Sequence, residues 1–318
     1  MTERPRLSII IVNWNSKDDL RECLQSLRLQ THSDLEIIVV DNGSADGSIA
    51  MVEHDFPHCL LLAQRENLGF AEACNIGIAA SRSPWVAMLN NDAVADPHWA
   101  ETLINAAVAA PADCGMLQSL LLYKGRPNVI NSAGIELAYS GGGRDRKEGK
   151  HYVPENETAE ENIFCPTAGA AAYRREMLDA IRLNSGYFDS VHFLYYEDMD
   201  IGWRARLAGW SARYIPTSIV YHKWHGSSDR HGRRRLRLLA NTNRIRMLLK
   251  NASLEFILAT LPRTLKELGE IVWYGRVAAL ANLFSAVATS LRTRQQVTTM
   301  ARVARAQVEK EYRARPMR

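Results

Sequence analysis

The first hundred residues alternate between short apolar runs and amphipathic stretches. The apolar runs have the length of strands, at residues 7–14, 35–41, 59–64 and 85–92. Stretches with helical spacing lie between them, at residues 17–29 and 69–80. Apolar runs joined by helices are typical of strands that are buried on both faces in a parallel sheet. The pattern therefore predicts an α/β domain with a mostly parallel central sheet, in which all four of these strands are buried.

The stretch from residue 140 to residue 222 is less regular. Residues 140–162 are rich in glycine and then in charge, which predicts a mobile loop. Residues 164–175 predict a strand whose small side chains let backbone approach a ligand. A helix is predicted from Glu197 to Gly209, because glycine is a favourable residue at a helix C-terminus. A last strand ends at the two histidines His222 and His225.

The chain changes character at residue 230. Residues 230–250 contain no acidic side chain and have the spacing of a basic amphipathic helix. Residues 271–291 reach the roughly 20 residues of a membrane span, but they carry Arg276 and Asn282. An interfacial helix at an anionic membrane surface fits this stretch better. A soluble helical hairpin or an oligomer interface stays open as the alternative.

Charge divides the chain at the same place. Residues 1–229 carry 20 Lys and Arg against 30 Asp and Glu, whereas residues 230–318 carry 19 against 5. This asymmetry predicts two modules, residues 1–229 and residues 230–318, with different partners. The five cysteines form no C-x-x-C pair and predict reduced thiols in a cytosolic protein, and the N-terminus does not have the pattern of a signal peptide. Nucleic acid is not expected as a partner, since the basic stretch contains no recognised binding motif.

Polar residues follow the predicted strands at the edge where parallel sheets bind ligands. They are residues 13–15, 41–44, 65–67 and 90–92. Asp92 could hold Mg²⁺ or Mn²⁺ against phosphates, although Asn90-Asn91-Asp92 is also ordinary turn chemistry. Asp41 could bind a nucleoside or simply cap its own loop. The fingerprints of a Rossmann dinucleotide site, a P-loop and an α/β-hydrolase elbow are all absent from the sequence.

Three carboxylates crowd the start of the helix predicted at residue 197. Glu197, Asp198 and Asp200 lie within four positions, beside Tyr196 and Trp203. Like charges repel and burial adds to the cost, so such a cluster needs a cation or a task in proton transfer. A general base in an aromatic pocket, where sugars bind, would explain it. Either His222 or His225 could complete a metal site with Asp92.

In chain order, these segments resemble the family 2 glycosyltransferases of the GT-A fold, which have a Rossmann-like sheet. The resemblance is strongest to a bacterial subgroup of rhamnosyl- and galactofuranosyltransferase-like enzymes, and it runs from Leu7 to about Ser228. The segments are SIIIVNWN, IIVVDNGSADGS, NLGFAEACNIGI, LNNDA, GAAAYRR, YYEDMDIGWRARLAGW and HKWHGSS. Each segment alone is weak evidence, whereas seven in the right order are strong evidence.

The resemblance implies a role for each matching residue. Asp198 would be the general base, with Glu197 orienting it, and Asp92 and His222 would bind the metal. Asn90 replaces the first Asp of the family's D-x-D element, which removes one charge. Acceptor binding would fall to Asp200, Tyr196 and Trp203. The nucleotide-sugar would be bound by Val12, Asn13, Asn15, Asp41, Arg65, Asn67, Gly69, Asn75, Asn90 and Asn91.

The implied function is metal-dependent, inverting transfer of a sugar from a nucleotide-diphosphate donor. The donor would be dTDP-rhamnose or a UDP-sugar, and the acceptor a hydroxyl of a glycan or a polyprenyl-linked glycan in cell-surface polysaccharide synthesis. The basic C-terminal module would place the protein on the cytoplasmic face of the membrane or form a homo-oligomer. The alternative, which Asn90 favours, is a catalytically inactive protein of the same fold that binds nucleotide-sugars or glycans.

Overall fold

The computed structural model of the protein describes residues 6–158, 160–161, 163–223 and 232–313. The strands are β1 (Leu7–Asn13), β2 (Leu35–Asp41), β3 (Leu60–Ala63), β4 (Trp85–Leu89), β5 (Ala93–Ala95), β6 (Cys114–Tyr123), β7 (Arg126–Ser132), β8 (Ile135–Leu137), β9 (Gly143–Asp145), β10 (Glu160–Glu161), β11 (Ala170–Arg174) and β12 (Ser211–His222). The helices are α1 (Lys17–Arg28), α2 (Ser48–Asp55), α3 (Phe70–Ala80), α4 (Trp99–Val108), α5 (Arg175–Ala180), α6 (Glu197–Leu207), α7 (Arg233–Asn251), α8 (Leu254–Ala259), α9 (Leu261–Met300) and α10 (Arg305–Tyr312), with 3₁₀ turns η1 (Pro154–Asn156) and η2 (Ser190–His192).

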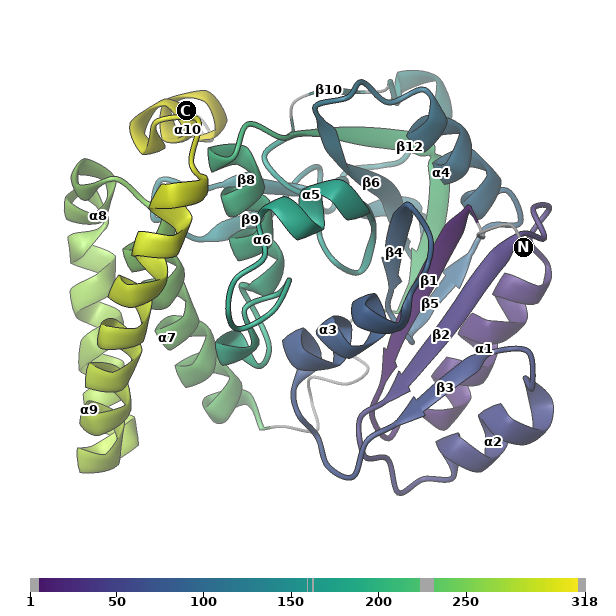
Figure 1. The fold of residues 1–318 in the computed structure, drawn as a ribbon, viewed down its shortest axis with the longest axis horizontal. Coiled ribbons are helices and arrows are strands. Elements are labelled where there is room, and N and C mark those ends of the chain that lie inside the picture. The colour runs from purple at the N-terminus through teal and green to yellow at the C-terminus, as the bar shows by residue number, and fades with distance from the viewer. Residues whose placement is uncertain (1–5, 159, 162, 224–231, 314–318) are drawn as a thin grey trace.

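Ten strands of the described chain form one sheet with helices on both faces (Figure 1). The main path runs β10-β12-β6-β11-β4-β1-β2-β3, and β5 and β7 pair with β12 and β6. The strands β4, β1, β2 and β3 are parallel, as the sequence predicts. β11 is antiparallel to both of its neighbours, β4 and β6. The prediction of an α/β fold with a Rossmann-like sheet is therefore confirmed.

Side chains on alternate positions of the strands separate two cores. Ile9 and Ile11 of β1 belong to the core between the sheet and the helices α1, α2 and α4. Ile10 belongs to the core on the opposite face, between the sheet and the helices α3, α5 and α6. This alternation is the reason that the strands read as continuous apolar runs. β3 is the exception, because it lies at the edge of the sheet and Leu60 is exposed. The prediction that residues 59–64 form a buried strand is wrong for that reason.

The glycine-rich stretch after residue 140 is more ordered than predicted. It contains β9, which pairs with β8 in a two-stranded sheet, and the turn η1. A Cβ atom at Gly143 would approach the Met199 sulfur to 2.5 Å. Glycine therefore permits close packing of this hairpin against α6, and composition alone does not distinguish that use from flexibility. Similarly, only residues 170–174 of the strand predicted at 164–175 are extended in the sheet.

The C-terminal helices share a core with α6. Met247 of α7, Phe256 of α8 and Val308 of α10 belong to the same buried cluster as Trp203 and Leu207. α7 and α9 lie side by side next to the end of the sheet that carries α6 (Figure 1). The predicted basic helix is present as α7, but its cations Arg244 and Lys250 are buried in ion pairs rather than exposed.

The stretch predicted to be interfacial forms part of α9. Trp273 and Phe284 are 81% and 76% exposed. None of the helices in the described chain is both long and apolar enough to cross a membrane. The histidine His225 lies outside the described residues, as do residues 224–228 of the final resembling segment.

Candidate active site

A cavity of about 350 Å³ opens at the carboxyl ends of β1, β2 and β4. Side chains from the strand ends form one wall, and residues 193–195, 197 and 198 around the start of α6 form the other. The predicted site residues that line it are Val12, Asn67, Gly69, Asn90, Asn91, Asp92, Glu197, Asp198 and His222. The structure thus brings together, in one cavity, residues that the sequence separates by more than two hundred positions.

The predicted metal ligands Asp92 and His222 contact each other across the end of the sheet. Oδ1 of Asp92 lies 3.1 Å from Nε2 of His222. On the other side of the ring, Nδ1 lies 2.9 Å from Oδ1 of Asn131, which can only accept a hydrogen bond. Nδ1 therefore donates to Asn131, and Nε2 faces the carboxylate of Asp92. The Asp92 carboxylate and the Nε2 lone pair of a neutral His222 could both bind one divalent cation placed between them.

Asn90 completes this group on the cavity side. Its Nδ2 lies 3.1 Å from the same Nε2 of His222, to which it can donate a hydrogen bond. The amide of Asn90 can therefore donate to His222 when the ring is neutral, which a carboxylate at this position could not do. The donor set is one carboxylate and one imidazole, so phosphate oxygens would have to supply further ligands to Mg²⁺ or Mn²⁺.

The pair Glu197 and Asp198 lies at the first turn of α6, on the opposite wall. Oδ1 of Asp198 accepts a hydrogen bond of 2.7 Å from the Met199 amide. Burial raises the pKa of Asp198, and the nearby Asp145 adds to that rise. Burial and then the charge of Asp198 raise the pKa of Glu197 further. Burial and the repulsion between acidic groups thus favour a proton on this pair.

A second cavity of about 300 Å³ adjoins the first. Asp145, Thr167, Tyr195 and Asp198 line both cavities. Tyr196 and Ala240 of α7 line only the second. Asp198 therefore stands between two spaces, each large enough for a bound group, and α7 contributes to the wall of one of them.

Several predicted nucleotide-binding residues lie behind the cavity and support its wall. Nδ2 of Asn13 donates to Oδ2 of Asp41 at 3.0 Å, and Oδ1 of Asn13 accepts from Asn91 at 2.9 Å, so these side chains tie β1, β2 and β4 together. Asn15 accepts a hydrogen bond from the Ala45 amide. None of Asn13, Asn15 and Asp41 is among the residues that line the cavity.

Two further predicted residues also lie away from the cavity wall. The side chain of Asn75 makes two hydrogen bonds to the backbone of Phe188, at 2.8 and 2.9 Å. Arg65 is exposed beyond the rim. Asn75 therefore shapes the segment before α6, and neither residue lines the cavity.

Two predicted acceptor residues are also directed elsewhere. Trp203 is fully buried and contacts Phe164 and Phe256 in the core shared with the C-terminal helices. Asp200 is fully buried too, and its carboxylate pairs with Arg204 at 3.0 Å and with Lys250 at 2.8 Å. The structure brings Tyr196 to the second cavity and leaves Asp200 and Trp203 in the interior.

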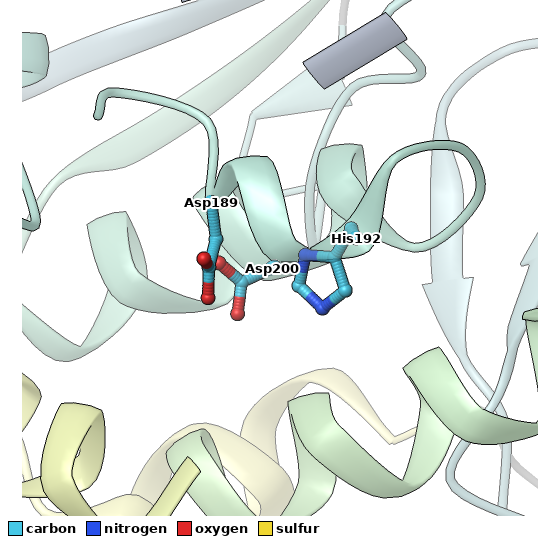
Figure 2. Close-up of side chains that lie close together, drawn as sticks. All are labelled: Asp189, His192 and Asp200. Atoms are coloured by element: carbon cyan, nitrogen blue, oxygen red, sulfur yellow. The ribbon is translucent and has the colours of Figure 1, made fainter. Parts of the chain in front are cut away.

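Asp189, His192 and Asp200 form a buried cluster next to these residues (Figure 2). One ligand atom from each lies within 4.8 Å of the others, a spacing that a metal could use. However, Nζ of Lys250 contacts both carboxylates. Burial alone would raise the pKa of Asp200, but Lys250 and Arg204 overcome it and lower that pKa. The ammonium group already supplies the positive charge, so the cluster fits an internal ion network better than a metal centre.

Sequence reasoning missed part of the cavity wall. Trp14 and Asn42 lie in the strand-end stretches 13–15 and 41–44 that the sequence marks, and residues 167–169 lie in the stretch predicted to approach a ligand, although none was assigned a role. The missed residues are Phe70, Asp145, Phe193, Leu194 and Tyr195. Asp145 offered no signal, because it lies in the stretch predicted as a loop.

Comparison with known proteins identifies the fold and the family. The model of the family described as glycosyl transferase family 2 matches residues 8–182, which is more than half of the chain. The chain belongs to glycosyl transferase family 2. The matched residues include the ends of β1, β2 and β4 that form the first wall of the cavity. The predicted enzyme class, glycosyltransferase, is therefore confirmed.

Family 2 relatives are similar over most of this chain. The EpsH protein of Bacillus subtilis (strain 168) is 26% identical over 228 residues, or 71% of this chain, and the chain spans only 63% of that relative's length. An N-acetylglucosaminyl-diphospho-decaprenol L-rhamnosyltransferase of Mycobacterium tuberculosis (strain H37Rv) is 28% identical over 244 residues, covering 70% of this chain and 77% of that protein.

Among solved structures, the mannosyltransferase PcManGT from Pyrobaculum calidifontis, in complex with GDP-Man and Mn²⁺, superposes with a TM-score of 0.55. The match covers 94% of this chain and 86% of that one at 17% identity. At that identity the likeness concerns the fold, and it confirms that this chain has the fold of a family of sugar-transferring enzymes.

Proposed function

We propose that the protein is a divalent-metal-dependent, inverting glycosyltransferase. It would move a sugar from a nucleotide-diphosphate donor to a hydroxyl group of a glycan or lipid-linked glycan. The observation that carries the proposal is the convergence of Asp92, His222 and Asp198 on one cavity. Membership in glycosyl transferase family 2 supports the class of reaction.

The proposed donor occupies the larger cavity, with its diphosphate toward Asp92 and His222. The lone pair of His222 Nε2 and the Asp92 carboxylate are suited to Mg²⁺ or Mn²⁺, and the Mn²⁺ bound in the PcManGT structure supports such an ion in this fold. When bound, the ion would neutralise charge on the departing diphosphate. Asn67, Gly69 and Asn42 line the same cavity and offer polar groups to the nucleotide.

Asp198 is the proposed general base. It would take the proton of the acceptor hydroxyl while that oxygen attacks the anomeric carbon on the side opposite the diphosphate. The bond from the anomeric carbon to the diphosphate oxygen breaks, and the nucleoside diphosphate leaves with the electron pair. A raised pKa suits this role, because a base works best when its pKa is near the working pH. A proton on the Glu197–Asp198 pair would avoid a second negative charge beside the base.

The acceptor would enter through the second cavity, since Asp198 lines both spaces. Tyr196 and Tyr195 offer aromatic faces there, a surface on which sugar rings bind. The Mycobacterium relative is named for a diphospho-decaprenol-linked acceptor, and this supports a lipid-linked glycan for this chain. A rhamnosyl donor is supported by the same name, with UDP-sugars as the competing class.

The exposed apolar side chains of α9 support a further proposal, contact of the C-terminal helices with an anionic membrane surface. Trp273 and Phe284 would lie at the headgroups, and the excess of basic residues after residue 230 would attract the surface. The protein would then work at the cytoplasmic face, and a homo-oligomer through the same helices is the alternative.

Calorimetry with a panel of nucleotide-sugars tests the catalytic proposal directly. The panel contains dTDP-rhamnose, UDP-galactofuranose and UDP-N-acetylhexosamines, each with and without Mn²⁺. Wild-type protein should bind one donor only with the metal. Asp92→Asn should abolish the metal-dependent binding, because it removes the carboxylate that lies 3.1 Å from Nε2 of His222. Asp198→Asn should bind the donor normally and lose slow hydrolysis of it.

Asp113→Asn is the matched control, since Asp113 is exposed and does not line either cavity. It should behave as wild type in every arm. Failure of all donors to bind the wild-type protein with either metal would contradict the proposal. Metal-dependent binding without any turnover, when suitable acceptors are supplied, would favour the catalytically inactive binding protein that Asn90 suggests.

A further inference from the structure

The wall of the active site contains a segment with an unusual backbone, residues 192–196. Phe193, Tyr195 and Tyr196 have φ angles of 60°, 72° and 70°. Bulky residues rarely adopt positive φ, and each such residue costs free energy unless its surroundings impose it. The same segment lines the larger cavity and leads directly into Glu197 and Asp198. Something outside the segment must therefore hold it in this conformation.

Two elements from opposite ends of the chain hold four successive carbonyl groups of this segment. On one side, the first amides of α3 donate to the Phe193 oxygen, from Phe70 at 2.6 Å and from Ala71 at 3.3 Å. On the other side, Nδ2 of Asn243 in α7 lies 2.6 Å from the His192 oxygen, 3.0 Å from that of Leu194 and 3.1 Å from that of Tyr195. The Phe193 carbonyl thus points to α3, and the carbonyls of residues 192, 194 and 195 point to α7.

The burial of Asn243 makes these contacts specific. Its side chain is fully buried, and its Oδ1 accepts a hydrogen bond of 3.1 Å from Arg246. That bond fixes which end of the amide is Nδ2 and directs the donors to the segment. Loss of the amide would leave the carbonyls of Leu194 and Tyr195 without this donor, and that of His192 with only its bond from the Leu194 amide.

We propose that Asn243 is a positioning residue for catalysis. It holds residues 192–195 in the strained conformation that shapes the cavity and presents Asp198 at its wall. The catalytic site is then incomplete without the C-terminal module, although no residue of α7 takes part in the chemical step. The inference rests on the proposed function for its effect on turnover, whereas its effect on the segment is independent of that function.

The first test compares two replacements at the same position. Asn243→Ala removes the donors, and Asn243→Asp keeps the shape while turning an acceptor toward three carbonyl oxygens. Both variants should lower kcat by about 10- to 100-fold, because misplaced catalytic groups cost rates of that size. Asn243→Asp should lose at least as much as Asn243→Ala. Wild-type turnover in either variant would overturn the inference.

Matched controls separate positioning from loss of stability. Met247→Ala alters a fully buried side chain one turn further along α7, in the core shared with α6, and breaks no hydrogen bond to the segment. At a temperature where each variant is folded, Met247→Ala should keep wild-type kcat. Asn241→Ala, which loses only a bond to Glu270, should do the same. A loss in Met247→Ala equal to that in Asn243→Ala would show a merely structural role and overturn the inference.

Hydrogen exchange provides a readout that needs no substrate. The amides of Phe193 and Leu194 donate to Ser190 and His192 within the segment, and those of Phe70 and Ala71 donate to its Phe193 carbonyl. Their exchange should accelerate at least about tenfold in Asn243→Ala and stay unchanged in Met247→Ala. Unchanged exchange in Asn243→Ala would overturn the inference. Failure of the proposed function would instead appear in the wild-type protein, as absence of donor binding.

Discussion

Two pairs of acidic side chains lie around the first turn of α6, and the protein treats them in opposite ways. Asp189 and Asp200 contact Lys250, and Asp200 also contacts Arg204. Glu197 and Asp198 have no ion pair among the described residues, and Oε2 of Glu197 has no hydrogen-bond partner there. Asp189, Asp200 and Glu197 are buried and Asp198 is half-buried at the cavity wall, so burial alone does not separate the two pairs.

The difference lies in compensation. For Asp189 and Asp200, nearby cations overcome the effect of burial and lower both pKa values. For Glu197 and Asp198, burial acts without a cation and raises both. The pair with a nearby cation is neutralised within the fold. The pair without one retains the free-energy cost of burial, a feature typical of groups that transfer protons. Three carboxylates in four positions thus divide between two tasks.

The largest expected effect comes from removing the uncompensated charge. Asp198→Asn should lower the rate of sugar transfer by about 10²- to 10⁴-fold, since the acceptor hydroxyl loses its base. It should not lower the free energy of unfolding, because the amide no longer needs the solvation that burial denies to the charge. Turnover and denaturant unfolding measure the two quantities. A large loss of stability would show that Asp198 belongs with the compensated pair.

Breaking the compensated pair should do the reverse. Lys250→Met leaves Asp189 and Asp200 buried without their common cation and should cost about 3–5 kcal/mol of unfolding free energy. Denaturant unfolding at neutral pH measures the loss. Lys310→Met, at an exposed position on α10, is the control and should change little. A small effect of Lys250→Met would mean that water or Arg204 replaces the ammonium group.

The smallest expected effect is a difference in pH dependence. Folding raises the pKa of Glu197, so the folded protein binds the extra proton, and stability from this group is lost as pH rises through the folded pKa. As pH rises from mildly acidic to mildly alkaline, the unfolding free energy of Glu197→Gln should therefore increase by about 1 kcal/mol or more relative to that of wild type. Unfolding titrations across that range measure the gain.

The compensated pair has the opposite dependence. Its stability is present above the ordinary carboxyl pKa and is lost as pH falls toward the lowered folded values. Glu255→Gln, at an exposed position in α8, should run parallel to wild type and serves as the control. If the unfolding free energy of Glu197→Gln also changes with pH in parallel with that of wild type, the Glu197 carboxyl group is not held protonated in the folded protein.

The sequence predicts the sheet and the cavity edge well for a physical reason. Strands buried on both faces leave continuous apolar runs, and parallel strands gather their polar ends at one edge. Asp92 and His222 are predicted in this way, Asp198 is predicted from the crowding of carboxylates at the start of a helix, and all three line the cavity. The signal is local in each case, so no knowledge of distant contacts is needed.

Asp200 and Trp203 could not be assigned in the same way. Their surroundings depend on Lys250, Phe256 and the other C-terminal side chains that lie about fifty positions later. The burial of Arg244 in the basic helix could not be predicted for the same reason, because the sequence does not distinguish a buried arginine from an exposed one. Asp145 was missed because the glycines at 141–143 that precede it are as typical of a flexible loop as of close packing.

The order in which the chain is synthesised gives the two-sided support of residues 192–195 a consequence. The amides of Phe70 and Ala71 leave the ribosome before the segment does, whereas Asn243 and Lys250 follow it by about fifty residues. Until they emerge, the sheet can form, but the carbonyls of residues 194 and 195 lack the Asn243 donor, and Asp189 and Asp200 lack their common cation. A nascent chain of this protein therefore has the strand-end wall of the cavity before the wall at the start of α6 has its full support.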